Sequence, residues 1–242
     1  AGKRLGRAMA LYLAERGFDV AVHYATSQAA AEETAANIEA QGQRASLLQA
    51  NLLDEAETQA LLPRAAAALG GPITCLVNNA SIFEADDIHT ATAESWERHI
   101  GSNLRAPFVL TQAMARQGLQ ATSDERGEPC ATGLIVNMID QRVHSPTPEF
   151  MSYTIAKMGL WAMTRSTAQA LALAIRVNGI GPGPTLQGQH QTEEVFAQER
   201  RDTVLERGVN LEDITAALGY FLDAPAITGQ LICPDGGEHL KW

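Results

Sequence analysis

The chain has 242 residues, of which 45% are hydrophobic, and it carries a net charge of -10 with a pI of about 5.0. This composition fits one large domain with a buried core, so we treat 1–242 as a single unit. The acidic balance argues against a nucleic-acid partner, and no apolar run reaches the ~18 residues of a membrane-spanning helix. Three widely spaced cysteines indicate neither disulfides nor a zinc site. We expect a cytoplasmic protein without a metal.

Apolar runs typical of strands alternate along the chain with Ala- and Leu-rich stretches of helical period. Strands are predicted at 18–24, 44–50, 73–78, 132–138, 175–180 and 229–233. Helices are predicted at 5–16, 27–41, from 54 onward, and at 93–117, 151–173, 193–207 and 211–221, with Ser27 as an N-cap. The polar stretch 120–132 is predicted to be a solvated loop. This alternation predicts an α/β fold with a parallel sheet and helices on both faces.

The beginning of the sequence departs from this alternation. The first helical stretch starts at about residue 5, and no strand stands before it. There is also no initiator Met. We therefore expect that the natural chain starts several residues earlier and that a first strand precedes residue 1.

Tyr153 and Lys157 stand four residues apart in S-Y-T-I-A-K on a predicted helix. Side chains at i and i+4 share one helix face, so the phenol and the ammonium project into the same space. A neighbouring cation favours the charged form of a phenol, whose ordinary pKa is ~10, and such a tyrosine can serve in general acid–base catalysis. A surface lysine beside a half-buried tyrosine gives the same spacing by chance, so the pair needs support from other motifs.

In parallel α/β sheets, ligands bind beyond the carboxyl ends of the strands, and three polar turns of this chain fall there. G-K-R-L-G over 2–6 leads into a helix whose N-terminal amides can hold a phosphate, although Lys3 and Arg4 interrupt the glycines. N-N-A-S over 78–81 and N-G-I-G-P-G-P-T over 178–185 each follow a strand. An ordinary Asx-rich turn and an irregular loop explain the last two equally well on their own.

The order and spacing of these motifs resemble the short-chain dehydrogenase/reductase family across nearly the whole chain. The resemblance rests on N-N-A after a strand, Asn103 in S-N-L-R-A-P-F, Y-x-x-x-K on a long helix, Pro182-Gly183 after the next strand and D-G-G at 235–237. It implies a three-layer Rossmann-type fold, a nicotinamide cofactor, hydride transfer to a small-molecule substrate and a homotetramer. The family's leading Thr-Gly is absent, which leaves the start of the phosphate loop undefined.

The resemblance also implies roles for single residues. Tyr153 would be the proton donor or acceptor, Lys157 would hold the nicotinamide ribose and lower the tyrosine pKa, and Asn103 would support a proton relay. The implied cofactor-binding residues are Gly2, Arg4, Leu5, Gly6, His23, Tyr24, Thr26, Ser27, Asn51, Leu52, Asn79, Ala80, Ser81, Tyr153, Lys157, Pro182, Gly183 and Thr185. Among them, Gly2 and Gly6 would flank the pyrophosphate turn, Asn51 would touch adenine and Thr185 would reach the carboxamide.

The sequence favours NADP over NAD. NAD-preferring sites place an acid near the end of the second strand of the fold to bind the ribose 2′-hydroxyl. The corresponding stretch here, H-Y-A-T-S over 23–27, contains no acid. Arg4 offers a cation for a 2′-phosphate, and Thr26 and Ser27 offer hydroxyls and nearby amides.

Two departures from the common family pattern resemble pteridine reductases and dihydromonapterin reductases: Arg4 replaces a glycine, and Asp140 replaces a serine. N-A-S-I-F over 79–83 resembles the loop of the same subgroup. By that likeness, Phe83 and the nicotinamide would sandwich a flat pterin ring, and Arg4, Ser81, Asp140 and Tyr153 would also face the substrate. Taken singly, Phe83 can be a packing residue, Arg4 a surface charge, and Asp140 a cap or an ion-pair partner of its neighbour Arg142.

A carboxylate near Tyr153 has a physical consequence. An ionised Asp140 would raise the phenol pKa through like-charge coupling, which favours a tyrosine acid and therefore a reduction. The leading hypothesis is an NADPH-dependent reductase of a pterin-like C=N heterocycle. The alternatives are a short-chain carbonyl reductase and a catalytically silent NADP-binding regulatory protein. Intact Tyr153, Lys157 and Asn103 argue against the last.

Overall fold

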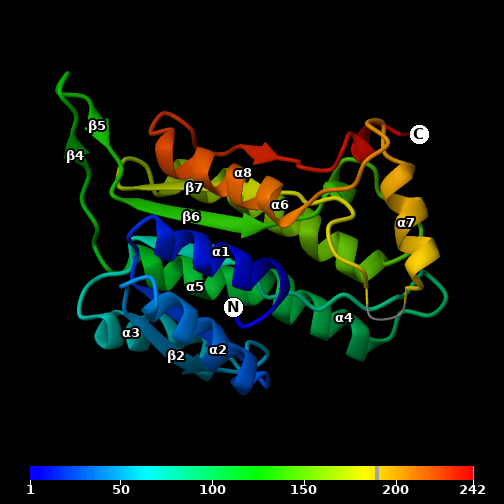
Figure 1. Cartoon of the computed structure of the whole chain (residues 1–242), viewed down its shortest axis with the longest axis horizontal. Coiled ribbons are helices and arrows are strands. Elements are labelled where there is room, and N and C mark those ends of the chain that lie inside the picture. The colour runs from blue at the N-terminus through cyan, green and yellow to red at the C-terminus, as the bar shows by residue number, and fades with distance from the viewer. Residues whose placement is uncertain (189–190, 242) are drawn as a thin grey trace.

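The computed structural model describes residues 1–188 and 191–241, and their parallel strands form two groups. The first group pairs β1 (Val20–Tyr24) with β2 (Ala45–Gln49). The second holds β3 (Cys75–Asn78), β6 (Gly133–Met138), β7 (Ile175–Ile180) and β8 (Leu231–Ile232), hydrogen-bonded in that order (Figure 1). All these pairs are parallel, so the strands end at a common carboxyl edge.

Helices cover both faces of the strands, which confirms the predicted three-layer α/β architecture. One layer contains α1 (Arg4–Glu15), α2 (Gln28–Glu39) and α8 (Leu211–Asp223), and the other contains α3 (Glu55–Leu69), α5 (Ala106–Ala115) and α6 (Met151–Ala170). Two further helices, α4 (Ala93–Ile100) and α7 (Glu193–Arg201), lie toward the carboxyl edge (Figure 1). No helix among the described residues is long and apolar enough to cross a membrane.

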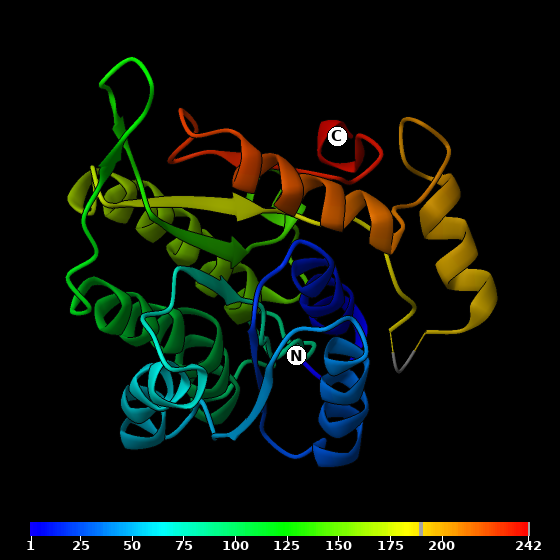
Figure 2. The same ribbon diagram turned by 60° about the vertical axis from the view of Figure 1, so that its left-hand side comes forward.

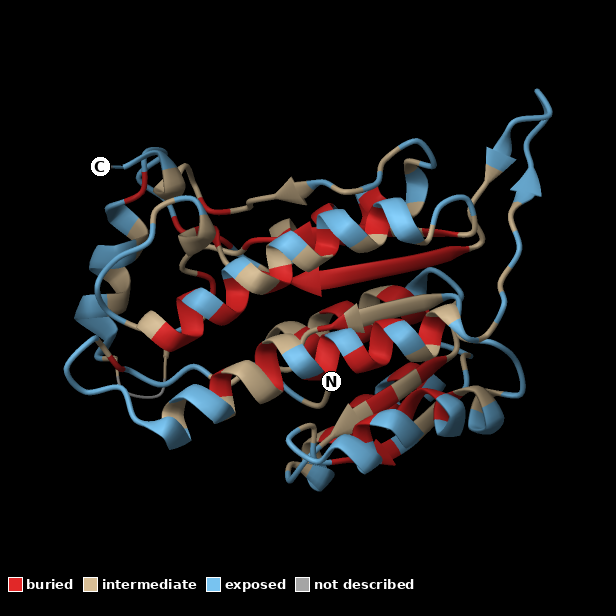
Figure 3. Cartoon of the chain, turned by 180° about the vertical axis from the view of Figure 1, so that it is seen from behind, coloured by how far each residue is buried: buried red, intermediate tan, exposed pale blue. Residues whose placement is uncertain are grey.

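The core lies on the two sides of β6, whose six residues are all buried. Leu134, Val136 and Met138 pack into the cluster formed with α1 and α8, whereas Ile135 packs into the cluster formed with α3 and α5. Figure 3 shows the buried residues concentrated in the strands and on the helix faces turned toward them. A strand buried on both faces is typical of parallel sheets covered by two helical layers.

A cavity of about 470 Å³ separates the two groups of strands. Within residues 1–188 and 191–241, no hydrogen-bonded ladder joins β1 to β3. Apolar side chains of the flanking elements line the space, including Met9 and Leu13 of α1, Val20 of β1 and Leu76 of β3.

Three segments differ from the sequence prediction. The helix expected over 193–207 ends at Arg201, because Thr203 folds the next turn by bonding both the N–H and the C=O of Arg207. The helix expected over 93–117 is interrupted by a π-helical turn at Gly101–Arg105. The predicted loop 120–132 contains a short antiparallel hairpin, β4 (Thr122–Ser123) and β5 (Pro129–Cys130), which projects away from the body in Figures 1 and 2.

Candidate active site

Helix α6 places Tyr153 beside Asp140, the second residue after the end of β6. The phenol donates a hydrogen bond to Asp140 Oδ2 over 2.7 Å. The other carboxylate oxygen, Oδ1, accepts the backbone N–H of Arg142 at 2.9 Å, so Asp140 also caps the short helical turn Gln141–Val143. Both predicted roles of Asp140 are therefore present. One carboxylate oxygen accepts the Tyr153 hydroxyl, and the other caps the helical turn.

The surroundings raise the pKa of Tyr153 well above its ordinary value. Burial of the phenol is the largest cause, followed by the charge of Asp140 and the hydrogen bond to it, while Arg142 and Ser81 act in the opposite direction. The prediction that Asp140 raises this pKa is confirmed, whereas Lys157, expected to lower it, is not among the groups that shift it. Burial disfavours the phenolate, and Asp140 adds like-charge repulsion. The phenol of Tyr153 is thus held in its protonated form.

Lys157 lies one turn along α6 and is buried, and its ammonium donates a hydrogen bond to the carbonyl of Met138 at 2.7 Å. The ammonium sits 5.5 Å from the centroid of the Tyr153 ring. Burial lowers the pKa of Lys157 to about 8, and the charge of Asp140 opposes this shift. The i, i+4 pair predicted from the sequence is therefore assembled in the interior, which excludes the chance surface arrangement.

Asn103 lies in the π-helical turn and is fully buried. Its side-chain amide bonds both backbone groups of Ile82: the oxygen accepts the Ile82 N–H at 2.9 Å, and the Nδ2 group donates to the Ile82 carbonyl at 2.8 Å. Insertion of a wider turn in an α-helix re-aims one side chain, a device that is frequent at functional sites. Asn103 thereby fixes the loop that carries Ser81 and Phe83.

Phe83 projects from that loop with 53% of its surface exposed. Its ring stacks on Phe150, with centroids 4.2 Å apart and planes 7° from parallel, and it meets the Tyr153 ring edge-on at 4.7 Å. Arg142 covers Phe150, its guanidinium 5.2 Å from the ring centroid. Sequence reasoning missed Phe150, which stands at the N-terminus of α6 and whose aromatic character was the only signal. Phe83 therefore has an aromatic partner within the chain on one face.

The residues predicted to hold the adenosine end gather where β1 and β2 end. His23 and Tyr24 close β1, and the His23 Nε2 atom lies 2.9 Å from the carbonyl of Ala50, just after β2. Asn51 and Leu52 follow directly in the chain. Thr26 is exposed, and Ser27 stands at the N-cap position of α2 without a capping hydrogen bond from its side chain.

Ser27 thus occupies its predicted position but does not perform the predicted cap, which leaves the hydroxyl available to a ligand. Arg4 is placed differently from the expectation of a 2′-phosphate contact. Its guanidinium donates to the carbonyls of Leu186 and Gln187 at 3.0 and 2.8 Å, in the loop that follows β7. This placement does not support contact with a phosphate beside Thr26 and Ser27.

The elements around the predicted pyrophosphate turn fit a dinucleotide. Helix α1 begins after Lys3 with no side-chain cap and no acid in its first turn, so its leading amides, those of Leu5 and Gly6 among them, suit an anion. A Cβ added at Gly6 would lie 2.8 Å from the side-chain amide of Asn79, so a larger residue here would displace that amide. Gly2 packs similarly against the backbone of Ala31.

The turns after β3, β6 and β7 converge. Asn79, Ala80 and Ser81 follow β3, and Asp140 follows β6. The carbonyl of Pro182 accepts the N–H of Gln141 at 3.5 Å, Gly183 packs against Asp235, and Thr185 Oγ1 donates to the Gly183 carbonyl at 2.9 Å. The predicted residues therefore collect along one edge, the adenosine set on β1 and β2 and the reactive set on β3, β6 and β7. In the described part of the chain, no cluster of His, Cys, Asp and Glu is arranged to hold a metal ion.

An α/β fold with a Tyr–Lys pair on the helix after the central strand and an asparagine anchored beside it defines a short-chain oxidoreductase. The family model described as enoyl-(acyl carrier protein) reductase matches residues 1–239. The chain belongs to this family, the short-chain dehydrogenases/reductases.

Several relatives share nearly the full length. The 3-oxoacyl-[acyl-carrier-protein] reductase FabG of Staphylococcus aureus is 30% identical over 99% of this chain and 96% of its own. Pteridine reductase 1 of Leishmania tarentolae is 31% identical over 99% and 94%. Among solved structures, FolM alternative dihydrofolate reductase 1 from Brucella suis, in complex with NADP, is 40% identical with a TM-score of 0.90, covering 100% of this chain and 93% of that one.

Proposed function

We propose that this chain is an NADPH-dependent reductase of a pterin-like C=N heterocycle. The observation that carries the proposal is the hydrogen bond from Tyr153 to Asp140, formed beside the exposed ring of Phe83. A carboxylate bound to the proton donor keeps the phenol protonated and can also stabilise positive charge on a ring nitrogen that is gaining a proton. A serine at this position would offer a hydrogen bond to a carbonyl oxygen without that electrostatic bias.

Each residue of the site then has a proposed role in the reduction. NADPH, when bound, supplies the hydride. Tyr153 holds the proton to be delivered, Asp140 keeps the phenol hydrogen-bonded, and Lys157 offers its ammonium to the nicotinamide ribose. Phe83 gives a flat substrate an aromatic surface to stack on, which is worth roughly 1 kcal/mol beyond the area it buries.

Relatives support both the pterin hypothesis and one alternative. Pteridine reductase 1 and the FolM alternative dihydrofolate reductase carry names that point to pterin and folate substrates, and the FolM structure contains NADP. The FabG relatives, named as 3-oxoacyl reductases, favour a carbonyl substrate instead. The carboxylate of Asp140, which accepts a hydrogen bond from the Tyr153 phenol, supports the pterin substrate.

A substrate panel tests the proposal. Purified protein is assayed with NADPH and dihydrobiopterin, folate or a small diketone, and NADPH oxidation is followed. We expect turnover with the reduced pterin. Good turnover of the diketone with no activity on either pterin would remove the pterin assignment and leave the carbonyl reductase. NADPH binding without turnover of any substrate would favour the catalytically silent regulatory protein.

NADPH is expected to be preferred over NADH. The end of β1 carries no acid to bind a ribose 2′-hydroxyl, and the hydroxyls of Thr26 and Ser27 are available to a 2′-phosphate. Steady-state kinetics with each cofactor measure the preference. A double variant, Thr26→Ala with Ser27→Ala, should lower the affinity for NADPH more than the affinity for NADH. Equal kcat/KM with the two cofactors in the wild type would contradict the prediction.

Turnover is expected to fall as the pH rises through about 8, the value to which burial lowers the pKa of Lys157. Below that pH the ammonium is charged and can hold the ribose, and above it the charge is lost. NADPH affinity, measured by fluorescence from pH 6 to 10, should follow the same curve. Lys157→Arg keeps a permanent charge and should flatten it. Wild-type affinity that stays constant to pH 10 would exclude this role.

We also infer that the chain is a homo-oligomer, as the family resemblance implies. Large apolar side chains are exposed on the neighbouring helices α5 and α6, namely Phe108, Ile155 and Met158. Such a surface is costly to leave in water and is typical of an interface between copies. Light scattering on wild type and Phe108→Glu should show loss of the larger species in the variant, and a wild-type monomer would contradict it. The cytoplasmic location stays a prediction.

A further inference from the structure

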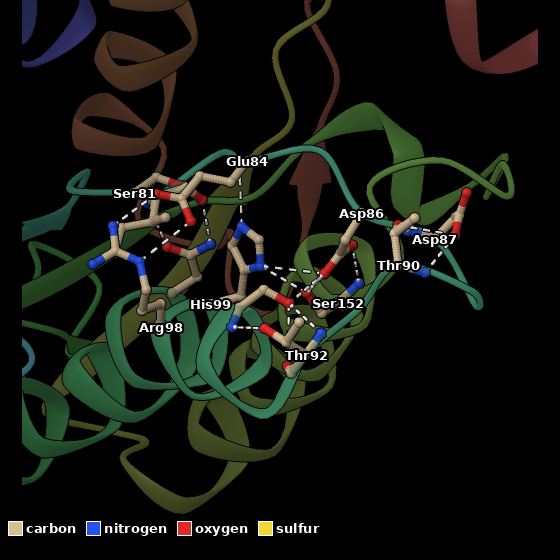
Figure 4. A network of polar contacts seen from close by, with 12 residues as sticks. Ser81, Glu84, Asp86, Asp87, Thr90, Thr92, Arg98, His99 and Ser152 are labelled. Carbon is tan, nitrogen blue, oxygen red and sulfur yellow. Dashed lines mark hydrogen bonds and ion pairs between the residues drawn. The ribbon is translucent and has the colours of Figure 1, made fainter.

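A buried polar network joins the loop that follows β3 to the start of the catalytic helix (Figure 4). Its centre is Asp86, almost fully buried, whose carboxylate accepts hydrogen bonds from the Ser152 N–H at 3.1 Å, from the Ser152 hydroxyl, and from Ser95 at 3.0 Å. The carbonyl of Asp86 accepts the N–H of Met151. The N-cap residue of α6, Phe150, makes no side-chain cap. Asp86 therefore caps α6 from a distant loop and satisfies the amides that precede Tyr153.

His99 of α4 is fully buried at the other side of this network. Its Nε2 atom lies 3.2 Å from the backbone nitrogen of Glu84, and its Nδ1 atom lies 2.6 Å from the Ser152 hydroxyl. A backbone N–H can only donate, so Nε2 must carry the lone pair and Nδ1 the proton. The proton of Nδ1 is then donated to Ser152, whose own proton goes to Asp86. Each group in this series of hydrogen bonds therefore has a consistent assignment as donor or acceptor.

The groups around His99 favour this neutral form. Burial lowers its pKa, while Asp86 and Glu84 oppose the shift and Arg98 adds to it. Arg98 and Glu84 form an ion pair with each other at the surface, 2.6 Å apart, which reduces the net charge that the imidazole experiences. The Tyr153 ring, edge-on at 6.1 Å, completes the surroundings of His99.

The network is not a nucleophilic triad, although it contains Ser, His and Asp. The order of bonds is His99 to Ser152 to Asp86, so the histidine donates to the serine and cannot accept its proton. Ser152 and His99 are also enclosed and open to no substrate. The arrangement therefore serves geometry and not covalent chemistry.

Its geometric effect falls on Phe83. The loop is fixed at Ile82 by the two hydrogen bonds of Asn103, at Glu84 by His99 and at Asp86 by α6. Phe83 stands between the first two anchors, and the third is made by Ser152, which directly precedes Tyr153 in the chain. One imidazole thus connects the backbone beside the stacking ring to the helix turn that carries the proton donor.

We propose that His99 is a positioning residue of the reductase: its neutral imidazole, bonded to Glu84 and Ser152, sets the position of Phe83 relative to Tyr153. This inference deepens the proposed function, on which its kinetic part rests. Its structural part, the fixing of the 82–86 loop, does not depend on which substrate the enzyme reduces.

The first test compares His99→Leu with Glu97→Gln, a control at an exposed position of the same helix that lies outside the network. Hydrogen exchange of the amides over 82–86 is measured without substrate. We expect the amides over 82–86 to exchange about tenfold faster or more in His99→Leu, because the loop opens locally, and Glu97→Gln to match the wild type. Wild-type protection of this loop in His99→Leu would overturn the proposal.

The kinetic readout separates positioning from a general loss of folding. His99→Leu should lower kcat/KM for dihydrobiopterin by about tenfold or more, because a shift of about 1 Å between reacting groups is enough to do so. NADPH affinity should stay at the wild-type level, since the hydrogen bonds of His99 go to Glu84 and Ser152, which are not among the predicted cofactor-binding residues. A parallel fall in NADPH affinity and melting temperature, with unchanged kcat/KM per folded molecule, would reduce His99 to a packing residue and refute the proposal.

Two conservative variants cover the case in which leucine prevents folding. The amide oxygen of His99→Gln can reach the position of Nε2 and accept the Glu84 N–H, whereas His99→Asn can donate only near Nδ1 toward Ser152. We expect loop protection and pterin kinetics closer to wild type in His99→Gln than in His99→Asn. Equal behaviour of the two would contradict the assignment. If the wild type reduces no pterin, the substrate proposal fails, and the exchange comparison still decides the role of His99.

Discussion

Tyr153→Phe is expected to reduce turnover nearly to zero while NADPH binding stays close to the wild-type level. The change removes one oxygen, the donor of the 2.7 Å bond to Asp140. The ring remains, with its edge-on contact to Phe83 and its position over Lys157, so the packing of the site is preserved. A missing general acid costs ~10²–10⁴ in rate, which sets the scale of the loss.

The measurement pairs steady-state turnover with NADPH titration by fluorescence on the same preparation. Asp140 keeps its bond from the Arg142 N–H in the variant, so folding should not be affected, and a melting curve provides the control. Retention of most of the activity would place the proton donor elsewhere. A loss of NADPH binding equal to the loss of rate would show that the phenol supports the cofactor instead of the chemistry.

Much of the fold could be predicted because its signals are local. The β6 stretch, Gly133–Met138, reads as an apolar run and is buried on both faces, and the helix with Tyr153 and Lys157 follows in the order that a parallel sheet requires. The carboxyl-edge rule then places Asp140, Asn79 and Thr185 near one another without any knowledge of distances. These inferences depend on periodicity and order, which a single sequence contains.

What could not be predicted depends on three-dimensional surroundings. The direction of the Tyr153 pKa follows from burial, which the i, i+4 spacing to Lys157 does not report. Arg4 donates to carbonyls 182 and 183 residues away, in a loop whose course no local pattern fixes. Phe150 and His99 are ordinary side chains in the sequence, and their roles arise from contacts with Phe83 and Glu84.

Asp140→Ser is expected to lower pterin reduction by about 100-fold or more, within the range of a general acid–base group. The carboxylate holds the phenol proton and stabilises a ring nitrogen that gains a proton, and serine replaces neither its charge nor its reach. Reduction of a simple diketone should be unchanged or improved, because serine restores the arrangement common in the family. Asp140→Asn, which keeps the shape and loses the charge, is the matched control and should resemble the serine variant on pterins.

Phe83→Ala provides an independent test of the preference for a pterin over a diketone. Loss of the stacking ring should raise KM for dihydrobiopterin and leave KM for NADPH and for the diketone nearly unchanged, because only a flat ring stacks on the aromatic surface. If Asp140→Ser leaves the best substrate of the wild type unaffected, the carboxylate has no catalytic part, and the site is that of a carbonyl reductase. If Asp140→Ser and Phe83→Ala both slow the reduction of pterins and leave the reduction of the diketone unchanged, the charge of Asp140 and the stacking of Phe83 act on the same substrate. The pairing of Asp140 with Tyr153 then selects the pterin.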